Sequence, residues 1–204
     1  MTIETGVALS RFTTLGTGGP ARAFTRPGSV GELREALAWA AGEGLNAVAV
    51  GLGSNLLVAD EGVEALVLKL AGELAEVVVD GTILRVGGGA ANAVALHRAR
   101  AAELGSFEFA CAIPGTAGGG VRMNAGAYGG DFGGVLERAL VVGADHSEWR
   151  TAEELGLRYR HSDLRAGQIV AQVELRLEPR PVAEIKATIA ELQAQRKEIG
   201  RAHV

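Results

Sequence analysis

Residues 113 to 130 combine an unusual number of glycines with a few polar side chains that could bind a ligand. The segment reads Ile-Pro-Gly-Thr-Ala-Gly-Gly-Gly-Val-Arg-Met-Asn-Ala-Gly-Ala-Tyr-Gly-Gly. Glycine lets the main chain approach a flat or phosphorylated molecule without an intervening Cβ, and it reaches positive φ at little steric cost. Thr116, Asn124 and Tyr128 supply hydrogen-bonding groups within the segment. We interpret this stretch as backbone that lies against a ligand.

A second glycine loop, Gly51-Leu-Gly-Ser-Asn55, follows an apolar run at residues 47 to 50. The loop therefore lies at the end of a predicted strand, where successive N–H groups and the Ser54 hydroxyl can form a nest that binds phosphate. A single glycine loop is weak evidence, because an ordinary turn has a similar composition. Two such loops in one chain favour a ligand site.

Close packing and surface salt bridges offer simpler explanations for two features. The run from Gly118 to Gly120 could serve only the close packing of backbone, but Asn124 and Tyr128 nearby favour a ligand wall. Arg160, in Tyr159-Arg-His-Ser162, has the default interpretation of a surface cation in a salt bridge. Composition alone therefore favours the salt bridge for Arg160.

Composition and charge exclude several functional classes. The 204 residues, 48% of them hydrophobic, can bury a substantial core in one domain or two small lobes. A net charge of −4 and scattered lysines and arginines argue against nucleic-acid binding. The sequence has no apolar run of membrane-spanning length and no signal-peptide pattern at its start, so we expect a cytoplasmic protein without a membrane partner.

Neither the single cysteine nor the histidines have the surroundings of a reactive or metal-binding group. Cys111 lies between alanines, is interpreted as a small core residue, and excludes an internal disulfide. His97 and His161 have no carboxylate or cysteine at ligand spacing. We therefore expect no metal site.

Hydrophobic patterning predicts alternating strands and helices. Strands are predicted at residues 21–26, 47–50 as a buried strand, 65–70, 136–142 and 169–177, and as a hairpin of 75–79 with 83–86 through Asp80-Gly81. Helices are predicted from the Ser29 cap to residue 43, at 91–104 ended by Gly105, at 152–157, and at 182–197 as a solvated amphipathic helix. The pattern indicates an α+β fold with a boundary near residues 70–73, between a small βαβ lobe and a larger, more antiparallel lobe.

Four blocks of sequence resemble the UDP-N-acetylenolpyruvoylglucosamine reductase family in order and spacing. They are Thr13-Thr14-Leu-Gly-Thr-Gly-Gly-Pro-Ala21, Gly51-Leu-Gly-Ser-Asn-Leu-Leu57, Ile113-Pro-Gly-Thr116 with Met123-Asn-Ala-Gly-Ala-Tyr-Gly129, and Tyr159-Arg-His-Ser162. The resemblance covers about residues 10 to 197. It implies the two-lobed α+β FAD-binding fold of the vanillyl-alcohol-oxidase (PCMH) type, with a small lobe at 1–71 and a larger lobe at 72–180.

The resemblance also implies a cofactor and the residues that hold it. The cofactor is FAD, bound without a covalent bond, and NADPH is the hydride donor. The loop at residues 51–55 is implied to hold the FAD diphosphate through backbone N–H groups, and the second glycine segment is implied to line the flavin and its diphosphate. The implied cofactor-binding residues are Gly51, Leu52, Gly53, Ser54, Asn55, Leu56, Ile113, Pro114, Gly115, Thr116, Gly118, Gly119, Asn124, Gly126, Ala127 and Tyr128.

Arg160 acquires a catalytic role through the same resemblance. The family reduces UDP-N-acetylglucosamine enolpyruvate to UDP-N-acetylmuramate in peptidoglycan precursor synthesis, and Arg160 matches its catalytic arginine. Hydride addition to the alkene pushes negative charge onto the substrate carboxylate, and a guanidinium is suited to bind it because it stays charged and presents two donors. Tyr159 and Arg160 are thus expected to contact the substrate, and we expect a monomer.

The chain departs from the family pattern near its C-terminus. Family members continue after the helix at 181–197 into a third domain, which binds the UDP-sugar and carries a proton-donating serine and an assisting glutamate. No segment here resembles the Gly-Ser-Val-Phe-Lys-Asn-Pro block that bears the serine. Residues 198–204 match the translation of a common sequencing adapter, so we expect a foreign tail there and a chain that is inactive alone.

Two alternatives to a reductase stay open. One is an FAD-binding module without catalysis. The other is a flavin oxidase of the same fold, whose phosphate loop typically carries a residue bonded covalently to the flavin. The loop at 51–55 contains neither histidine nor cysteine, which argues against the oxidase.

Overall fold

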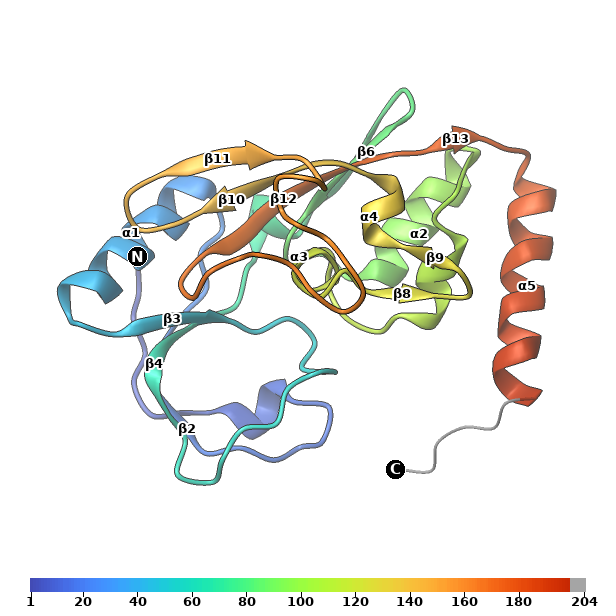
Figure 1. The fold of residues 1–204 in the computed structure, drawn as a ribbon. Helices are drawn as coiled ribbons and strands as arrows, with labels where there is room; N and C mark the ends of the chain where they lie inside the picture. Colours follow the sequence, from blue (N-terminus) through green and yellow to red (C-terminus); the bar gives the residue numbers. More distant parts are fainter. Residues whose placement is uncertain (199–204) are drawn as a thin grey trace.

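The structure, a computed structural model, describes residues 1–198 and contains two principal sheets (Figure 1). The first sheet has four strands in the order β1-β2-β4-β3, with β2, β4 and β3 parallel and β1 antiparallel to β2. Its strands are β1 at Val7–Ala8, β2 at Pro20–Thr25, β3 at Asn46–Ala49 and β4 at Val63–Leu68. The predicted foreign tail lies outside the described residues, apart from Glu198.

The second sheet has five antiparallel strands in the order β11-β10-β12-β6-β5. These strands are β5 at Val77–Asp80, β6 at Ile83–Gly87, β10 at Leu136–Val142, β11 at Ser147–Arg150 and β12 at Ile169–Arg176. Two small ribbons complete the strands, formed by β7 at Leu104–Gly105 with β13 at Glu178–Pro179, and by β8 at Gly126–Ala127 with β9 at Gly130–Asp131. The predicted boundary at residues 70–73 falls between the strands of the two main sheets.

Five α-helices and three 3-10 turns connect the strands. The helices are α1 at Val30–Gly42, α2 at Asn92–Ala101, α3 at Ala117–Arg122, α4 at Phe132–Val135 and α5 at Val182–Glu198. The 3-10 turns are η1 at Leu9–Phe12, η2 at Gly72–Ala75 and η3 at Glu108–Ala112. Among residues 1–198, no helix is both long enough and apolar enough to cross a bilayer.

Helix α1 links the cores of the two sheets. The Ser29 hydroxyl accepts a hydrogen bond from the Glu32 N–H at 3.2 Å and so caps the first turn, as predicted. The apolar face of α1 is buried together with residues of both sheets, namely Leu33, Ala36, Leu37 and Ala40 with Leu66, Leu68, Val142, Ile169 and Ala171. These residues form one continuous apolar cluster, which joins the four-stranded sheet to the five-stranded sheet.

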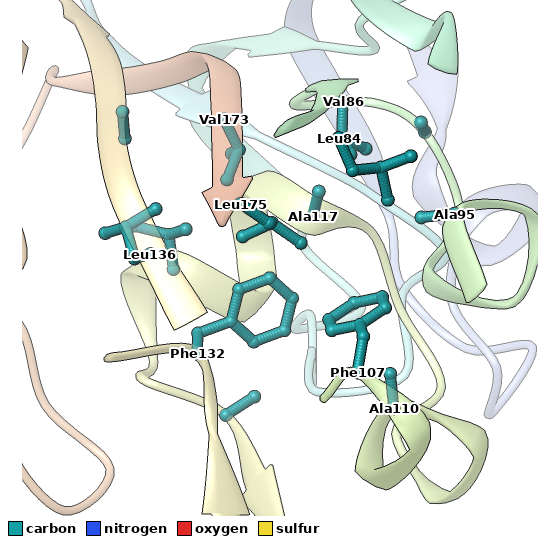
Figure 2. Packing of buried hydrophobic residues seen from close by; sticks show 14 of the residues in the cluster. Leu84, Val86, Ala95, Phe107, Ala110, Ala117, Phe132, Leu136, Val173 and Leu175 are labelled. Atoms are coloured by element: carbon teal, nitrogen blue, oxygen red, sulfur yellow. The ribbon is translucent and has the colours of Figure 1, made fainter. Parts of the chain in front are cut away.

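The larger core lies between the five-stranded sheet and the helices α2 and α3. Figure 2 shows the side chains that converge there, among them Leu84, Val86, Leu136, Val173, Leu175, Phe107 and Phe132. Phe107 meets Phe132 edge to face, with ring centroids 5.6 Å apart. Such pairs add about 0.5–1.5 kcal/mol to the effect of burial, and they fix Phe132 directly beneath α3.

Most predicted elements are confirmed, and three predictions are wrong. Strand β3 is an edge strand that exposes Val48, so it is not buried. Helix α2 ends at Ala101, before Gly105, because Glu103 has a φ of 58°. The predicted helix at 152–157 is a set of turns that Gly156 closes at a φ of 56°. The strand β11 and the helix α3 were not predicted.

Two glycines of α3 serve close packing. A Cβ at Gly118 would lie 2.9 Å from the Gly88 carbonyl oxygen, and a Cβ at Gly120 would overlap the Phe132 ring. At Gly119, in contrast, the nearest atom to an added Cβ would be Thr116 Oγ1 at 3.6 Å, an ordinary contact. The packing explanation therefore applies to Gly118 and Gly120, and Gly119 faces the other way.

The opposite surroundings of Gly119 and Gly120 generate a stability prediction. Gly120→Ala is expected to lower the free energy of unfolding by about 1–3 kcal/mol, because the new methyl group is forced into the Phe132 ring. Gly119→Ala is the matched control and is expected to raise it by up to about 1 kcal/mol through helix propensity. Urea unfolding of the ligand-free chain measures both, and equal effects of the two substitutions would contradict the packing.

Candidate functional site

The two glycine loops identified in the sequence lie against each other. A Cβ added at Gly51 would lie 2.7 Å from Thr116 Oγ1, and the Ser54 hydroxyl donates to the Pro114 carbonyl oxygen at 3.0 Å. Gly115 has a φ of 133°, a conformation that side-chain-bearing residues rarely adopt. The fold thus brings the strand-end loop and the second glycine segment into one site.

The carbonyl groups of the first three residues of the first loop are held inward. The Gly51 oxygen accepts from Lys69 Nζ, the Leu52 oxygen from Thr14 Oγ1 at 3.3 Å, and the Gly53 oxygen from the Thr14 N–H at 3.2 Å. Gly53 itself has a φ of 70°, and a Cβ there would overlap the Phe12 carbonyl. Three consecutive peptide groups therefore turn their oxygens toward the protein.

The N–H groups of the same loop have no partners within the described part of the chain. From residue 51 to residue 55, none of the five donates to an acceptor in residues 1–198. Successive N–H groups that are free while their carbonyls are bound make a concave cluster of positive partial charge. Clusters of this kind are suited to bind phosphate, so the geometry is compatible with the phosphate site that the glycine pattern predicts, and that site stays a prediction.

The second loop adds donors of the same kind. Asn92 holds the carbonyl groups of this second loop: its Nδ2 donates to the Ile113 oxygen at 3.3 Å, and its N–H donates to the Gly115 oxygen at 3.0 Å. The N–H groups of Gly115, Thr116 and Gly119 bond to no acceptor in residues 1–198, and neither does the Thr116 hydroxyl. Gly118 instead donates its N–H to the Gly88 oxygen at 2.9 Å, so its contacts are with the sheet.

Asn124 uses its side chain for internal hydrogen bonds. Its Nδ2 donates to Asp131 Oδ2 at 3.1 Å and to the Arg158 carbonyl oxygen at 3.3 Å, while its Oδ1 accepts from the Gly133 N–H at 2.8 Å. The residue is only 5% exposed. Asn124 therefore joins the β8–β9 ribbon to the segment that carries Arg160. Its amide stabilises the fold through these internal hydrogen bonds.

Arg160 lies beside the second glycine segment. Its Nη2 donates to the Gly126 carbonyl oxygen at 3.1 Å, and its guanidinium carbon lies 5.8 Å from the centre of the Tyr159 ring. Tyr159 is 88% exposed. The salt bridge expected from composition alone is absent, because Arg160 pairs with no carboxylate in the described residues.

The turn that carries Arg160 is fixed by Asp163. The carboxylate of Asp163 lies 3.0 Å from Arg158 Nη1 and 2.9 Å from His161 Nε2, and these two hydrogen bonds lower its pKa. A hydrogen bond of 2.6 Å from the Ser162 hydroxyl to the Arg122 oxygen ties the same turn to the end of α3. The backbone at Arg160 is therefore held on both sides.

Backbone strain is concentrated in this region. Only five residues other than glycine have positive φ among residues 1–198, and three of them belong to the predicted site: Asn124 at 36°, Tyr128 at 54° and Arg160 at 53°. Such conformations cost about 1–3 kcal/mol each and persist where surrounding contacts enforce them. Strain of this kind gathers at functional sites, which supports a ligand-binding role for the segment.

Three residues that are not among the predicted site residues also build the site: Thr14, which belongs to the first of the four sequence blocks, Lys69 and Asn92. Lys69 is half-buried, and its pKa is lowered by that burial and by the nearby charge of Arg26. A lysine inside the apolar run 65–70 was the signal that could have indicated it. A groove of about 530 Å³ lies elsewhere, beside Ile3, Trp39 and Glu64, and none of the predicted site residues lines it.

Comparison with known proteins identifies the family. A family model described as an FAD binding domain matches residues 21–145. The crystal structure of UDP-N-acetylenolpyruvylglucosamine reductase from Thermus caldophilus superimposes with a TM-score of 0.86 at 38% identity, covering 97% of this chain and 70% of that one. The chain belongs to the UDP-N-acetylenolpyruvoylglucosamine reductase family. The resemblance stated from the four sequence blocks is thereby confirmed.

Curated members of the reductase family are longer than this chain. Reductase 2 from Symbiobacterium thermophilum is 43% identical over 89% of this chain and 59% of its own length. The reductase from Enterococcus faecalis is 41% identical over 93% of this chain and 63% of its own length. The chain thus spans about three fifths of these relatives.

More distant structures confirm the fold class predicted for the reductase family. Cholesterol oxidase from Brevibacterium sterolicum has a TM-score of 0.66 at 12% identity. Glucooligosaccharide oxidase from Acremonium strictum has a TM-score of 0.60 at 20% identity. These similarities concern the fold alone, which is the α+β flavoprotein fold of the vanillyl-alcohol-oxidase type.

The internal hydrogen bonds of Asn124 generate a second prediction. Asn124→Ala leaves the Gly133 N–H unpaired and releases the Arg158 carbonyl, so the free energy of unfolding is expected to fall by about 1–3 kcal/mol. Asn55→Ala, on the exposed first loop, is the matched control and is expected to change it by less than about 0.5 kcal/mol. Denaturant titration without ligand distinguishes the two variants. An unchanged free energy of unfolding in Asn124→Ala would contradict the stabilising role of the Asn124 hydrogen bonds.

Proposed function

We propose that this chain binds FAD without a covalent bond and forms the flavin-binding part of an NADPH-dependent reductase. The reaction converts UDP-N-acetylglucosamine enolpyruvate to UDP-N-acetylmuramate for peptidoglycan precursor synthesis. One observation carries the proposal: the five successive N–H groups at residues 51–55 bond to no acceptor in residues 1–198, while the carbonyls of residues 51–53 are bound inward. Membership in the reductase family supports the choice of ligand and reaction.

The residues present fit the cofactor. The FAD diphosphate would bind the N–H groups of residues 51–55, together with those of Gly115, Thr116 and Gly119 and the Thr116 hydroxyl, which bonds to no acceptor in the described part of the chain. The absence of a Cβ at Gly51 leaves room beside Thr116 that any other residue would fill. The strained ribbon from Asn124 to Tyr128 would lie along the flavin, as the family resemblance implies.

Arg160 would bind the substrate carboxylate. When bound, FAD supplies hydride transfer from NADPH to the enolpyruvyl double bond. Arg160 turns Nη2 toward the Gly126 oxygen, and its Nε and Nη1 bond to no acceptor in residues 1–198. A fixed guanidinium with two donors left over is suited to an enolate whose negative charge spreads onto a carboxylate. Tyr159, exposed next to it, would contact the substrate.

The proposal extends to the cellular compartment and the oligomeric state of the protein. Both the substrate and the hydride donor are nucleotides, so we place the protein in the cytoplasm, and we expect it to act as a monomer. The flavin oxidase is disfavoured because residues 51–55 offer no histidine or cysteine for a covalent bond to FAD.

Cofactor choice tests the proposed ligand. The purified chain is expected to bind FAD and to release all of it on acid precipitation, since no covalent bond holds it. FMN lacks the adenylate and the second phosphate, so its affinity is expected to be at least about tenfold weaker, equivalent to about 1.4 kcal/mol. Fluorescence titration measures both. Equal affinity for FMN would refute the role of the 51–55 loop, and retained flavin would favour the oxidase.

Substitution of Arg160 tests the proposed chemistry. In a full-length version, Arg160→Lys is expected to keep its FAD but to slow flavin reoxidation by the enolpyruvyl substrate about 10²- to 10³-fold, because lysine lacks the planar pair of donors. Flavin reduction by NADPH is expected to suffer less. Arg22→Lys, at an exposed position on β2, is the control. Stopped-flow measurement of the two half-reactions decides, and normal turnover of Arg160→Ala would exclude the role.

A further inference from the structure

We propose that Lys69 is a positioning residue of the phosphate loop: it holds the Gly51 carbonyl inward and thereby keeps the N–H group of the same peptide, that of Leu52, turned outward to the FAD diphosphate. The inference rests on the proposed function, because it assumes that this loop binds a diphosphate. It assigns Lys69 a task at a distance from the ligand, through the peptide group that it holds.

The position of Lys69 follows from the parallel sheet. It comes directly after β4, where its N–H donates to the Thr25 carbonyl oxygen of β2 at 3.0 Å. On the other side, the Val50 N–H donates to the Leu68 oxygen at 2.9 Å and so places the start of the loop beside Lys69. The side chain then reaches the Gly51 oxygen. The central strand of the sheet therefore supplies the donor to the loop of the neighbouring strand.

Lys69 is the only charged group among the donors to the loop carbonyls of residues 51–53 within the described chain. Thr14 holds the Leu52 and Gly53 oxygens through a hydroxyl and an N–H, both neutral. A hydrogen bond from an ammonium group is about twice as strong as one between neutral groups. It also polarises the Gly51–Leu52 peptide, which increases the positive partial charge on the Leu52 N–H.

The charge of Lys69 has no counter-ion in the described residues. No carboxylate within residues 1–198 forms an ion pair with it, and the charge that shifts its pKa is that of the cation Arg26. Arg26 has partners of its own. Its Nη1 lies 2.7 Å from Glu4 Oε1 in a salt bridge, and its Cζ lies 4.7 Å from the centre of the Phe24 ring. Burial, and after it the charge of Arg26, lowers the pKa of Lys69, the direction expected for a cation with no anion beside it. A diphosphate on the outer side of the loop would supply that anion.

The test compares Lys69→Met and Lys69→Arg in the chain itself, with Lys186→Met on the exposed face of α5 as a matched control. Lys69→Met is expected to weaken FAD binding about 10- to 100-fold, the fold-change that corresponds to one lost charge-assisted hydrogen bond. Lys69→Arg is expected to recover most of the affinity, and Lys186→Met to keep it within about twofold, as surface substitutions usually do.

A second readout separates positioning from a general effect on the fold. FAD affinity of the unsubstituted chain is expected to fall with NaCl more steeply than that of Lys69→Met, because only the former places an uncompensated charge behind the diphosphate. Unfolding of the FAD-free proteins in urea is measured alongside. Unchanged FAD affinity in Lys69→Met overturns the inference, and so does a loss with the same salt dependence and no recovery in Lys69→Arg. Failure of the unsubstituted chain to bind FAD would instead overturn the proposed function itself.

Discussion

The direction of three peptide groups, at residues 51–53, governs what this protein can bind. A peptide group presents its N–H and its carbonyl on opposite sides, so holding the oxygens inward leaves the N–H groups outward. Lys69 and Thr14 supply the inward donors. Lys69 lies directly after the strand β4 and Thr14 lies in the loop after η1, so the loop depends on the assembled four-stranded sheet. Ser54 of the same loop links it to the second glycine segment, because its hydroxyl donates to the Pro114 carbonyl oxygen.

The identity of the loops could be predicted from sequence because their chemistry is local. Glycine at positions 51, 53 and 115 reports a backbone requirement that belongs to those residues alone, and the structure has positive φ at two of them. Hydrophobic period and turn residues likewise predicted most strands and the helix capped by Ser29. The prediction of a helix at 152–157 was wrong because Gly156, with its positive φ, ends the first turn. The apolar pattern of the segment gives no sign of this constraint.

The contributions of individual side chains could not be predicted, because they depend on partners far away in sequence. The glycines of α3 resemble one another in sequence, yet Gly118 and Gly120 face the sheet and Phe132 while Gly119 faces Thr116. Asn124 was expected at the ligand, but its amide is occupied by Asp131, Gly133 and Arg158. Lys69 was overlooked because the acceptor that explains it lies 18 positions earlier.

The shared packing of α1 has a thermodynamic consequence for the ligand. Since this helix buries one face against residues of both sheets, the lobes cannot part like a hinge without exposing Leu33, Leu37 and their neighbours to water. The packing of α1 thus opposes a hinge motion between the parts that carry the two loops. Binding to a preorganised surface loses little conformational entropy, so more of the contact energy remains as affinity. If the loop at residues 51–55 binds the FAD diphosphate as we propose, a helix outside that loop would lower the entropic cost of binding a large, flexible dinucleotide.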